Sequence, residues 1–426
     1  MFEDTDHVVL GASPTGSFAV LTRADRRRHL YVIGKTGTGK STLLLNLMHA
    51  DLQRGNGFAL LDPHGDLATA IADAAPAWRT NDIIYLNPAD LAFPLALNPL
   101  YNVALDRRSL VAAHIVAAFQ HIWGSSWGPR LEYILTNSLR LLLDAPGSTL
   151  LGLPRLLSDE NYRQCLLAHA RDPVVRSFWE NEFAEYSDRY AVEAIAPIQN
   201  KVGTLLSPPA LRNMLGQVRS TIDIRQIMDS GRVLIVNLAK GKLGEAPTHL
   251  LGAFIATAFA QAAECRADVA EHDRRDFTLY ADEFQNFATD SFASILSEAR
   301  KYRLALVLAH QFLGQLPSLL RQAVIGNAGS IVAFRIGAED SSLIADELGI
   351  ANKLALAELA NYQAWTKLLR DGVPADPHRI DTFAPEARSE GRLDAIRNRT
   401  RARYARPRAS VEAKIDRFLS AHAPSL

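Results

Sequence analysis

HLYVIGKTGTGKSTLL, residues 29–44, is the stretch of sequence that decides the fold. Its short apolar run, Leu30 to Ile33, predicts a buried strand. A glycine-rich loop follows, and we expect a helix from Ser41 to Gln53 that ends near Gly55. A loop of the form G-x4-G-K-S between a strand and a helix is typical of proteins that bind nucleotide phosphates.

The residue types of this loop explain that chemistry. Glycines let the backbone bend so that its N–H groups point at phosphate oxygens, and the start of the following helix adds partial positive charge. Lys40 is expected to reach the β- and γ-phosphates, and Ser41 to offer its hydroxyl to Mg2+. The residues expected to bind the nucleotide are Gly34, Lys35, Thr36, Gly37, Thr38, Gly39, Lys40, Ser41 and Thr42.

Strand and helix patterns alternate around this loop, which predicts an α/β fold with a mostly parallel central sheet covered by helices on both faces. The next strands are expected at Phe58–Leu61 and Ile83–Leu86. After a long helical stretch the alternation resumes, with expected elements at strand Val233–Leu238, helix 248–264, strand Phe277–Ala281, helix 291–302, strand Leu304–Ala309, strand Ser330–Phe334 and strand Ala364–Leu369.

The change of pattern divides the chain into four parts. Residues 1–106 and 229–387 are expected to form one ATPase core of the RecA-like type, and 107–228 an inserted all-α domain. Residues 388–426 form a basic tail, in which nine arginines and one lysine face four acids between positions 388 and 417. Either a solvated, partly helical tail or a contact with nucleic acid or a partner fits this composition.

The bulk properties set limits on function. The formal net charge is zero, so any contact with nucleic acid has to be local. Cys165 and Cys265 lie too far apart for a zinc knuckle or a redox pair, which favours a reduced, cytoplasmic compartment. The longest apolar-rich stretch, His249–Ala263, is shorter than the roughly 20 residues that span a bilayer. We therefore expect no intrinsic membrane anchor, and any recruitment to the inner membrane would depend on partners.

Two acids, Asp282 and Glu283, end the strand FTLYA. In enzymes with this phosphate loop, the first acid holds the magnesium ion. The second is placed to orient and deprotonate the attacking water. Acids are common at strand ends, so this pair alone could be an ordinary strand end. Because the phosphate loop lies upstream, we expect Asp282 to be the metal ligand and Glu283 the catalytic base.

Two further segments end strands at the same expected edge of the sheet. Gln311 ends LALVLAHQ and is a candidate contact for the γ-phosphate or the water, or alternatively a glutamine that bonds only to backbone. His310 beside it is interpreted as structural. The turn Asp62–Asp66, DPHGD, lies next to the nucleotide or serves only as a tight turn.

Two arginines are candidates for a residue that acts on the nucleotide of a neighbouring subunit. Arg300 precedes the strand that ends at Gln311, and Arg335 follows the strand SIVAF. Such an arginine is worth roughly 10³–10⁵ in rate. We favour Arg300, and a surface salt bridge is the alternative for either residue.

Together these segments resemble the HerA/FtsK superfamily of P-loop motors, and most closely its conjugative coupling proteins and related DNA-pumping ATPases of type IV secretion. The resemblance is carried by HLYVIGKTGTGKSTLL (29–44), LLDPHGDL (60–67), LNPL (97–100), LYADEFQNF (279–287), SEARKYRLALVLAHQ (297–311) and NAGSIVAFRIGAEDSSLIADELG (327–349). The helical insertion also resembles the all-α domain of the coupling proteins.

The resemblance implies a hexameric ring with ATP and Mg2+ between subunits and DNA, single- or double-stranded, in a central channel. It implies that Asp282 holds the metal, that Glu283 is the catalytic base, and that Gln311 is a sensor. It also implies that Arg300 acts in trans.

The resulting interpretation is an ATP-driven DNA translocase. The alternative is an ATPase adaptor or scaffold that recruits a relaxase, a nuclease or a secretion component without processive DNA pumping. Lys240 and Lys242 in AKGKLG, and the region after Glu283, are weak candidates for DNA contacts, and solvated loops are the plainer interpretation of these segments.

Overall fold

The computed structural model describes residues 7–289 and 291–420, which divide into two compact units. The first, which we call the sheet unit, comprises residues 1–87, 224–240 and 255–400. The second, the helical unit, comprises residues 88–223, 241–254 and 401–426. The division into parts at 106, 228 and 387 remains a prediction.

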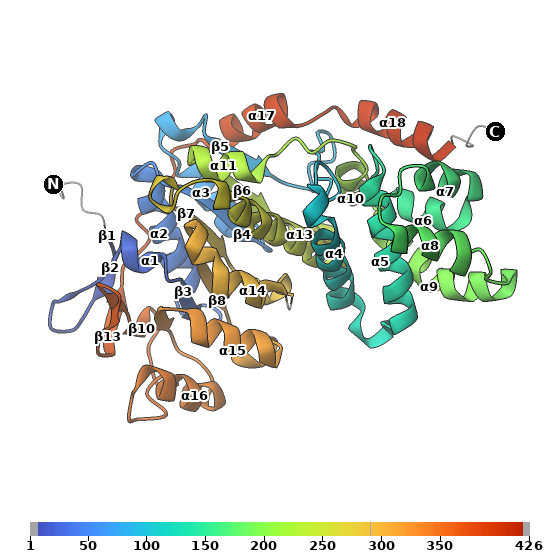
Figure 1. Cartoon of the computed structure of the whole chain (residues 1–426). Helices are drawn as coiled ribbons and strands as arrows, with labels where there is room; N and C mark the ends of the chain where they lie inside the picture. Colours follow the sequence, from blue (N-terminus) through green and yellow to red (C-terminus); the bar gives the residue numbers. More distant parts are fainter. Residues whose placement is uncertain (1–6, 290, 421–426) are drawn as a thin grey trace. The chain divides into compact units, whose positions relative to one another are not determined.

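The sheet unit is built on one sheet, in which the described residues form eleven strands in the order β2-β1-β13-β10-β9-β3-β8-β7-β4-β6-β5 (Figure 1). From β9 to β5 every pairing is parallel. These parallel strands are β3 (Leu30–Ile33), β4 (Gly57–Asp62), β5 (Ile83–Leu86), β6 (Val233–Asn237), β7 (Phe277–Ala281), β8 (Leu304–His310) and β9 (Ser330–Ala333). The predicted fold class, α/β with a mostly parallel sheet, is confirmed, and each predicted core strand lies within two residues of its observed bounds.

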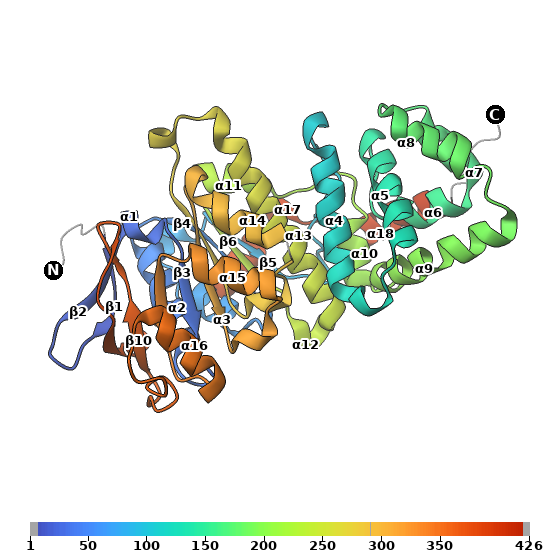
Figure 2. The same cartoon turned by 60° about the horizontal axis from the view of Figure 1, so that its bottom comes forward.

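The other end of the sheet is antiparallel, and of the four strands described there the sequence predicted one, at Ala364–Leu369. It consists of β10 (Gln363–Lys367), β13 (His378–Thr382), β1 (His7–Ala12) and β2 (Phe18–Thr22) (Figure 2). The predicted strand Ala364–Leu369 is interrupted, because Leu369–Arg370 (β11) leaves this sheet and pairs with Val373–Pro374 (β12).

Both faces of the parallel region are covered, which explains why its strands are continuous apolar runs. On one face, α2 (Lys40–Gln53) and α3 (Asp66–Asp73) contribute buried leucines and alanines to the same core cluster as β3 and β4. On the other, Phe259 of α13 (Glu245–Glu264) stacks on Phe277 with ring centroids 5.6 Å apart. The remaining helices of the sheet unit are α1 (Arg23–Arg26), α11 (Ile224–Ser230), α14 (Ser291–Glu298), α15 (Ser318–Asn327) and α16 (Ala338–Leu348).

The helical unit is formed by amphipathic helices, as the apolar periodicity predicted. Trp179 is 2% exposed and lies against Phe183, with ring centroids 4.6 Å apart. The longer helices are α4 (Arg108–Trp123), α5 (Pro129–Asp144) and α9 (Asp188–Leu206). The shorter ones are α6 (Gly152–Ser158), α7 (Glu160–Leu167), α8 (Pro173–Ser177), α10 (Pro209–Leu215) and α12 (Lys240–Leu243), the last of which begins in the sheet unit.

The basic C-terminal segment is packed rather than simply solvated. In the sheet unit, α17 (Leu393–Tyr404) buries Ile396 completely, and Thr400 accepts a hydrogen bond from the backbone N–H of Tyr85. In the helical unit, α18 (Arg408–Ser420) buries Val411 and Ile415 at 3% exposure each. Within residues 7–289 and 291–420, no helix is long and apolar enough to cross a membrane.

Candidate nucleotide-binding site

The phosphate loop lies between β3 and α2, where the sequence placed it. Glycine is required at two positions for different reasons. A Cβ at Gly34 would lie 2.6 Å from Cβ of Phe334, and Gly39 has φ +122°, a conformation that side chains rarely adopt. The resulting loop opens directly into the first turn of α2, whose free N–H groups form an anion site.

Lys40 is the charged group at the centre of this loop. Its side chain is 5% exposed, and Nζ donates to the carbonyl oxygens of Gly34 at 2.5 Å and Lys35 at 3.2 Å. Burial lowers the pKa of Lys40, while Glu283 and Asp282 act in the opposite direction. The loop thus surrounds one ammonium group with backbone, an arrangement that fits the phosphates of a nucleotide.

The acids Asp282 and Glu283 follow β7 at the same carboxyl edge of the sheet. Asp282 is 6% exposed, and burial, reinforced by the charges of Asp62 and Glu283, raises its pKa to about 7. Several carboxylates therefore face one lysine, and a divalent cation would favour their ionised forms. Over the described residues, no cluster of three or more His, Cys, Asp or Glu side chains suits a metal. Mg2+ binds through one or two carboxylates together with phosphates and water, and the carboxylate of Asp282 at this edge fits that ligand set.

Glu283 is held from three directions. Its Oε1 accepts from Nε2 of Gln311 at 2.9 Å, and its Oε2 accepts from Nε2 of Gln285 at 2.8 Å. Its carbonyl oxygen accepts from Nδ2 of Asn286 at 2.8 Å, and its backbone is left-handed, at φ 46° and ψ 50°. A strained backbone that is fixed by its surroundings is typical of functional positions. The structure therefore brings Gln311 to the expected catalytic base.

Gln285 and Asn286 were missed by the sequence reasoning. Asn286 also connects the acid turn to the segment after β6, because its Oδ1 accepts from Nζ of Lys240 at 3.1 Å. Lys240 thus has a position in this network, whereas Lys242 is exposed. The sequence signal for Gln285 and Asn286 is their position in LYADEFQNF, two and three residues after Glu283.

Asp62 and His310 are both buried next to the phosphate loop and the acids. Asp62 is 1% exposed and accepts hydrogen bonds from the backbone N–H groups of His64 and Ala68, at 2.9 and 2.8 Å. These bonds fit a tight turn, and the charge of Asp62 also acts on Asp282 at the carboxyl edge. His310 is fully buried against Tyr31, and burial together with the charge of Lys40 lowers its pKa to about 3.

The two candidate arginines lie on opposite edges of the sheet. Arg335 follows β9 beside the phosphate loop of its own chain, where its carbonyl oxygen accepts from the N–H of Lys35 at 2.8 Å. Its guanidinium donates to Oδ1 of Asn361 at 2.8 Å. Arg300 instead precedes β8, on the exposed turn η8 (Ala299–Tyr302). Since β8 has seven residues, about 23 Å of strand separates this turn from the carboxyl edge.

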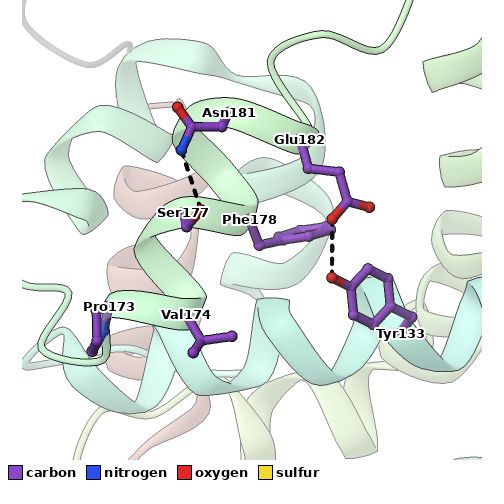
Figure 3. A pocket seen from close by; sticks show the side chains of 7 residues that line it. All are labelled: Tyr133, Pro173, Val174, Ser177, Phe178, Asn181 and Glu182. Atoms are coloured by element: carbon purple, nitrogen blue, oxygen red, sulfur yellow. Dashed lines mark hydrogen bonds between the residues drawn. The ribbon is translucent and has the colours of Figure 1, made fainter.

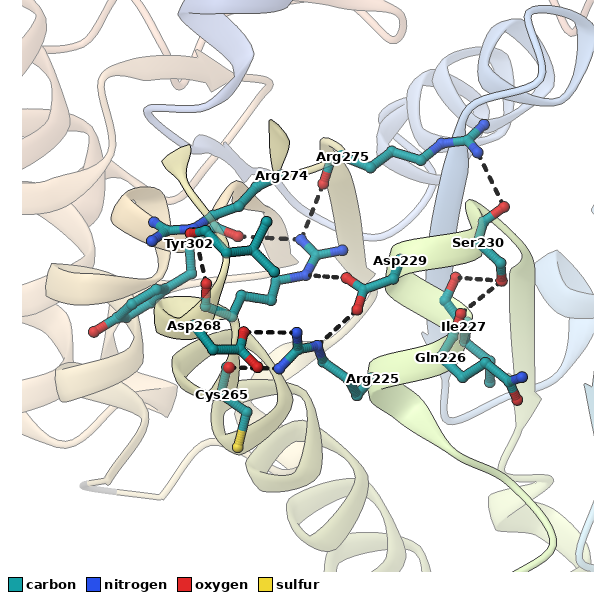
Figure 4. Close-up of polar contacts among 12 residues, drawn as sticks. Arg225, Gln226, Ile227, Asp229, Ser230, Cys265, Asp268, Arg274, Arg275 and Tyr302 are labelled. Carbon is teal, nitrogen blue, oxygen red and sulfur yellow. Dashed lines mark hydrogen bonds and ion pairs between the residues drawn. The ribbon is translucent and has the colours of Figure 1, made fainter. Parts of the chain in front are cut away.

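A network of arginines and acids in the sheet unit fixes that turn (Figure 4). Arg266 is fully buried, and its Nε donates to Oδ1 of Asp229 at 2.8 Å. Its Nη1 donates to the carbonyl oxygen of Tyr302 at 3.1 Å, and Arg274 donates to the carbonyl of Lys301. Two backbone carbonyls of the turn that carries Arg300 are therefore each held by a guanidinium group.

The helical unit has an open hollow of about 350 Å³ (Figure 3). Tyr133 donates from its hydroxyl to Oε2 of Glu182 at 3.0 Å on its wall. Glu182 is the one carboxylate among its lining residues, which are Tyr133, Pro173, Val174, Ser177, Phe178, Asn181 and Glu182.

Comparison with known proteins connects this geometry to a family. A protein-family model described as the type IV secretion-system coupling protein DNA-binding domain matches residues 17–352. None of the curated proteins compared matches the sequence.

Solved structures share the fold. The plasmid coupling protein TrwB in complex with ADP and Mg2+ has 17% identity and a TM-score of 0.63, over 88% of this chain and 89% of that chain. The trigonal form of TrwBdeltaN70 with sulphate has 17% identity and a TM-score of 0.65, over 92% of each chain. VirB4 of Thermoanaerobacter pseudethanolicus has 13% identity and a TM-score of 0.54, over 91% of this chain and 98% of that chain.

Proposed function

We propose that this chain, which belongs to the family of type IV secretion-system coupling proteins, is an ATP-driven motor that moves DNA as a hexameric ring. The observation that carries the proposal is the pairing of Glu283 with Gln311 at the edge where the phosphate loop opens. A module that only bound nucleotide would not need an oriented carboxylate there. The solved complexes of TrwB with ADP and Mg2+ and with a non-hydrolysable ATP analogue support ATP and Mg2+ as the ligands.

The residues then have distinct roles. Lys40 and the N–H groups of the loop bind the phosphates. Ser41 and Asp282 would hold Mg2+, whose charge would favour transfer of the phosphoryl group. Glu283 accepts the proton of the attacking water. Gln311 and Gln285 keep its two carboxylate oxygens in place, so that the base needs no reorientation.

The position of Arg300 supports assembly into a ring. Arg300, at the amino edge of the sheet, lies too far from the phosphate loop of its own chain to contact a nucleotide bound there. It could instead contact a nucleotide bound to the phosphate loop of a neighbouring copy. Contact between two different surfaces of identical subunits is a head-to-tail interface, which closes into rings. One subunit would then bind each nucleotide, and the next subunit would complete the active site around it.

The direct test is steady-state ATP hydrolysis with and without single- and double-stranded DNA, on protein whose assembly is sized by mass photometry. We expect hydrolysis that DNA stimulates, a stimulation that weakens with salt, and a hexameric species. Hydrolysis indifferent to DNA, together with capture of a protein partner, would favour the adaptor or scaffold instead. A monomer under all conditions would contradict the ring.

Within the same assay, Lys40→Ala and Glu283→Gln are expected to abolish turnover by different routes. Lys40→Ala removes the phosphate contact and so weakens binding of ATP. Glu283→Gln leaves binding intact and lowers kcat by about 10²–10⁴. Wild-type turnover in both variants would refute the site assignment.

A further inference from the structure

Tyr362 is an exposed aromatic residue beside the phosphate loop that neither the motifs nor the proposed mechanism use. Its side chain is 49% exposed. A Cβ built on Gly39 would lie 3.1 Å from Cδ1 of this ring, so the ring borders the loop immediately before Lys40. The other ring next to Gly39 belongs to Phe334, which is fully buried and offers no face to a ligand.

The backbone of Tyr362 is held in an unfavourable conformation. Its φ is +64°, in the left-handed region, which is unusual for a bulky side chain. Its N–H donates to the carbonyl oxygen of Thr38 at 2.7 Å. Its own carbonyl accepts from both the N–H and the hydroxyl of Thr382, at 2.8 and 2.9 Å. The ring is therefore fixed against the loop at a conformational cost, which suggests a function for its position.

The order of strands shows which part of a nucleotide would meet this ring. The acids that act at the terminal phosphate follow β7, and Gln311, which contacts Glu283, follows β8. The phosphate loop follows β3, and β9 and then β10 lie on the side of β3 away from β8. Tyr362 directly precedes β10. A nucleotide whose terminal phosphate points to the acids thus extends its nucleoside end toward Tyr362.

We propose that the ring of Tyr362 is the platform on which the base of the bound nucleotide stacks. This inference rests on nucleotide binding at the phosphate loop, and it adds the group that recognises the base. Aromatic rings stack on nucleobases with little dependence on which base is present, because every base has a π-face. Tyr362 would therefore strengthen the binding of purine nucleotides in general and would not by itself separate ATP from GTP.

The test compares a ligand that has a base with one that does not. Dissociation constants for ATP and for inorganic tripolyphosphate, both with Mg2+ and without DNA, are measured by titration calorimetry on the full chain. In Tyr362→Ala we expect the affinity for ATP to fall about tenfold and that for tripolyphosphate to stay within about twofold of wild type. Tyr362→Phe keeps the ring and is expected to bind both ligands as wild type does.

A matched control is Phe312→Ala. Phe312 is also 49% exposed and also lies at the carboxyl edge, but it follows β8, on the side of the acids. Its removal is expected to leave the ratio of the two dissociation constants unchanged. Lys40→Ala should weaken the binding of ATP and of tripolyphosphate alike. This variant therefore separates failure of the phosphate site from failure of the stacking proposal.

Two results would overturn the proposal. Equal losses of ATP and tripolyphosphate in Tyr362→Ala would show that the residue only braces the loop. An affinity for ATP within twofold of wild type would show that the ring does not touch the base. Melting temperatures of all variants establish that the protein is folded in each case.

Discussion

The two edges of the central sheet have opposite chemistry. At the carboxyl edge, the charges of Glu283 and Asp282 shift the pKa of Lys40, and those of Asp62 and Glu283 shift the pKa of Asp282. At the amino edge, guanidinium groups dominate, and their main task is to hold backbone carbonyls and paired aspartates. The comparison supports the proposal that the carboxyl edge contains most of an active site and that the amino edge holds one arginine in place for a neighbouring copy.

The largest effect is expected from removing that arginine. Arg300→Ala should lower kcat by about 10³–10⁵ while leaving the affinity for ATP close to wild type, because the residue would act only on charge that develops during transfer. Arg335→Ala is the matched control at the carboxyl edge. Its guanidinium donates to Asn361 and to the carbonyl of Leu359, so we expect a smaller change. A larger loss of kcat in Arg335→Ala would exchange the roles of the two residues.

The support beneath Arg300 gives the next prediction. Arg266→Ala removes a fully buried guanidinium together with its hydrogen bonds to Asp229 and to two backbone carbonyls, so we expect a loss of about 1.5–3 kcal/mol in stability. Arg225 bonds to the same Asp229 but is partly exposed, and Arg225→Ala should cost about 0–1 kcal/mol. Chemical denaturation followed by circular dichroism measures both. Equal effects would show that burial of Arg266 contributes nothing special.

At the carboxyl edge, the two amides on Glu283 offer a finer test. Gln311→Ala removes a hydrogen bond to a carboxylate, an interaction worth roughly 1.5–3 kcal/mol, and should lower kcat about tenfold or more. Gln285→Ala removes the donor to the other oxygen and is the matched comparison. Single-turnover rates separate the chemical step from product release. Unchanged rates in both variants would mean that the amides do not position the base.

The last prediction concerns pH and the stability of the fold, and it rests on His29. His29 is buried; its Nδ1 accepts from the N–H of Leu306, and its Nε2 lies 3.0 Å from the carbonyl oxygen of Leu296. Burial is the main cause that lowers its pKa to about 4. Below pH 6.5 the unfolded chain therefore binds a proton that the folded chain excludes, so stability falls as pH drops from 6.5 toward 4, by about 2 kcal/mol at pH 5.

Calorimetric melting at pH 7 and pH 5 measures this contribution. The shift in melting temperature between the two pH values should be smaller in His29→Gln than in wild type. An identical shift in both proteins would show that His29 does not titrate in this range.

Local patterns predicted the parallel part of the fold well, and the reason is physical. Strands buried on both faces are continuous apolar runs, as in Leu30–Ile33, and they can be recognised without knowledge of their neighbours. Strand β13 reads HRIDT and buries only Ile380 deeply, so its sequence contains no such signal. It forms a strand because β1 and β10 pair with it on both sides.

The residues of the candidate site likewise divide into those that a local sequence pattern reveals and those that it does not. Lys40, Asp282, Glu283 and Gln311 could be proposed from the sequence because each ends a strand or opens a helix at one edge, which a sequence motif can express. Tyr362 could not be proposed in this way, because its proximity to Gly39 depends on β10 lying next to β9 and on a left-handed backbone. Contacts of this kind join residues more than 300 positions apart and leave no local pattern.

The central claim is that one active site is shared between two copies of the chain, and mixing two inactive variants tests it directly. Arg300→Ala retains Glu283, and Glu283→Gln retains Arg300. An interface therefore contains both groups when an Arg300→Ala subunit binds the nucleotide and a Glu283→Gln subunit contributes the arginine. An equal mixture, reassembled and confirmed as mixed by mass photometry, should have intact sites at about a quarter of its interfaces and recover a corresponding part of the ATPase activity. Mixed assemblies that stay as inactive as their parents would contradict the shared site.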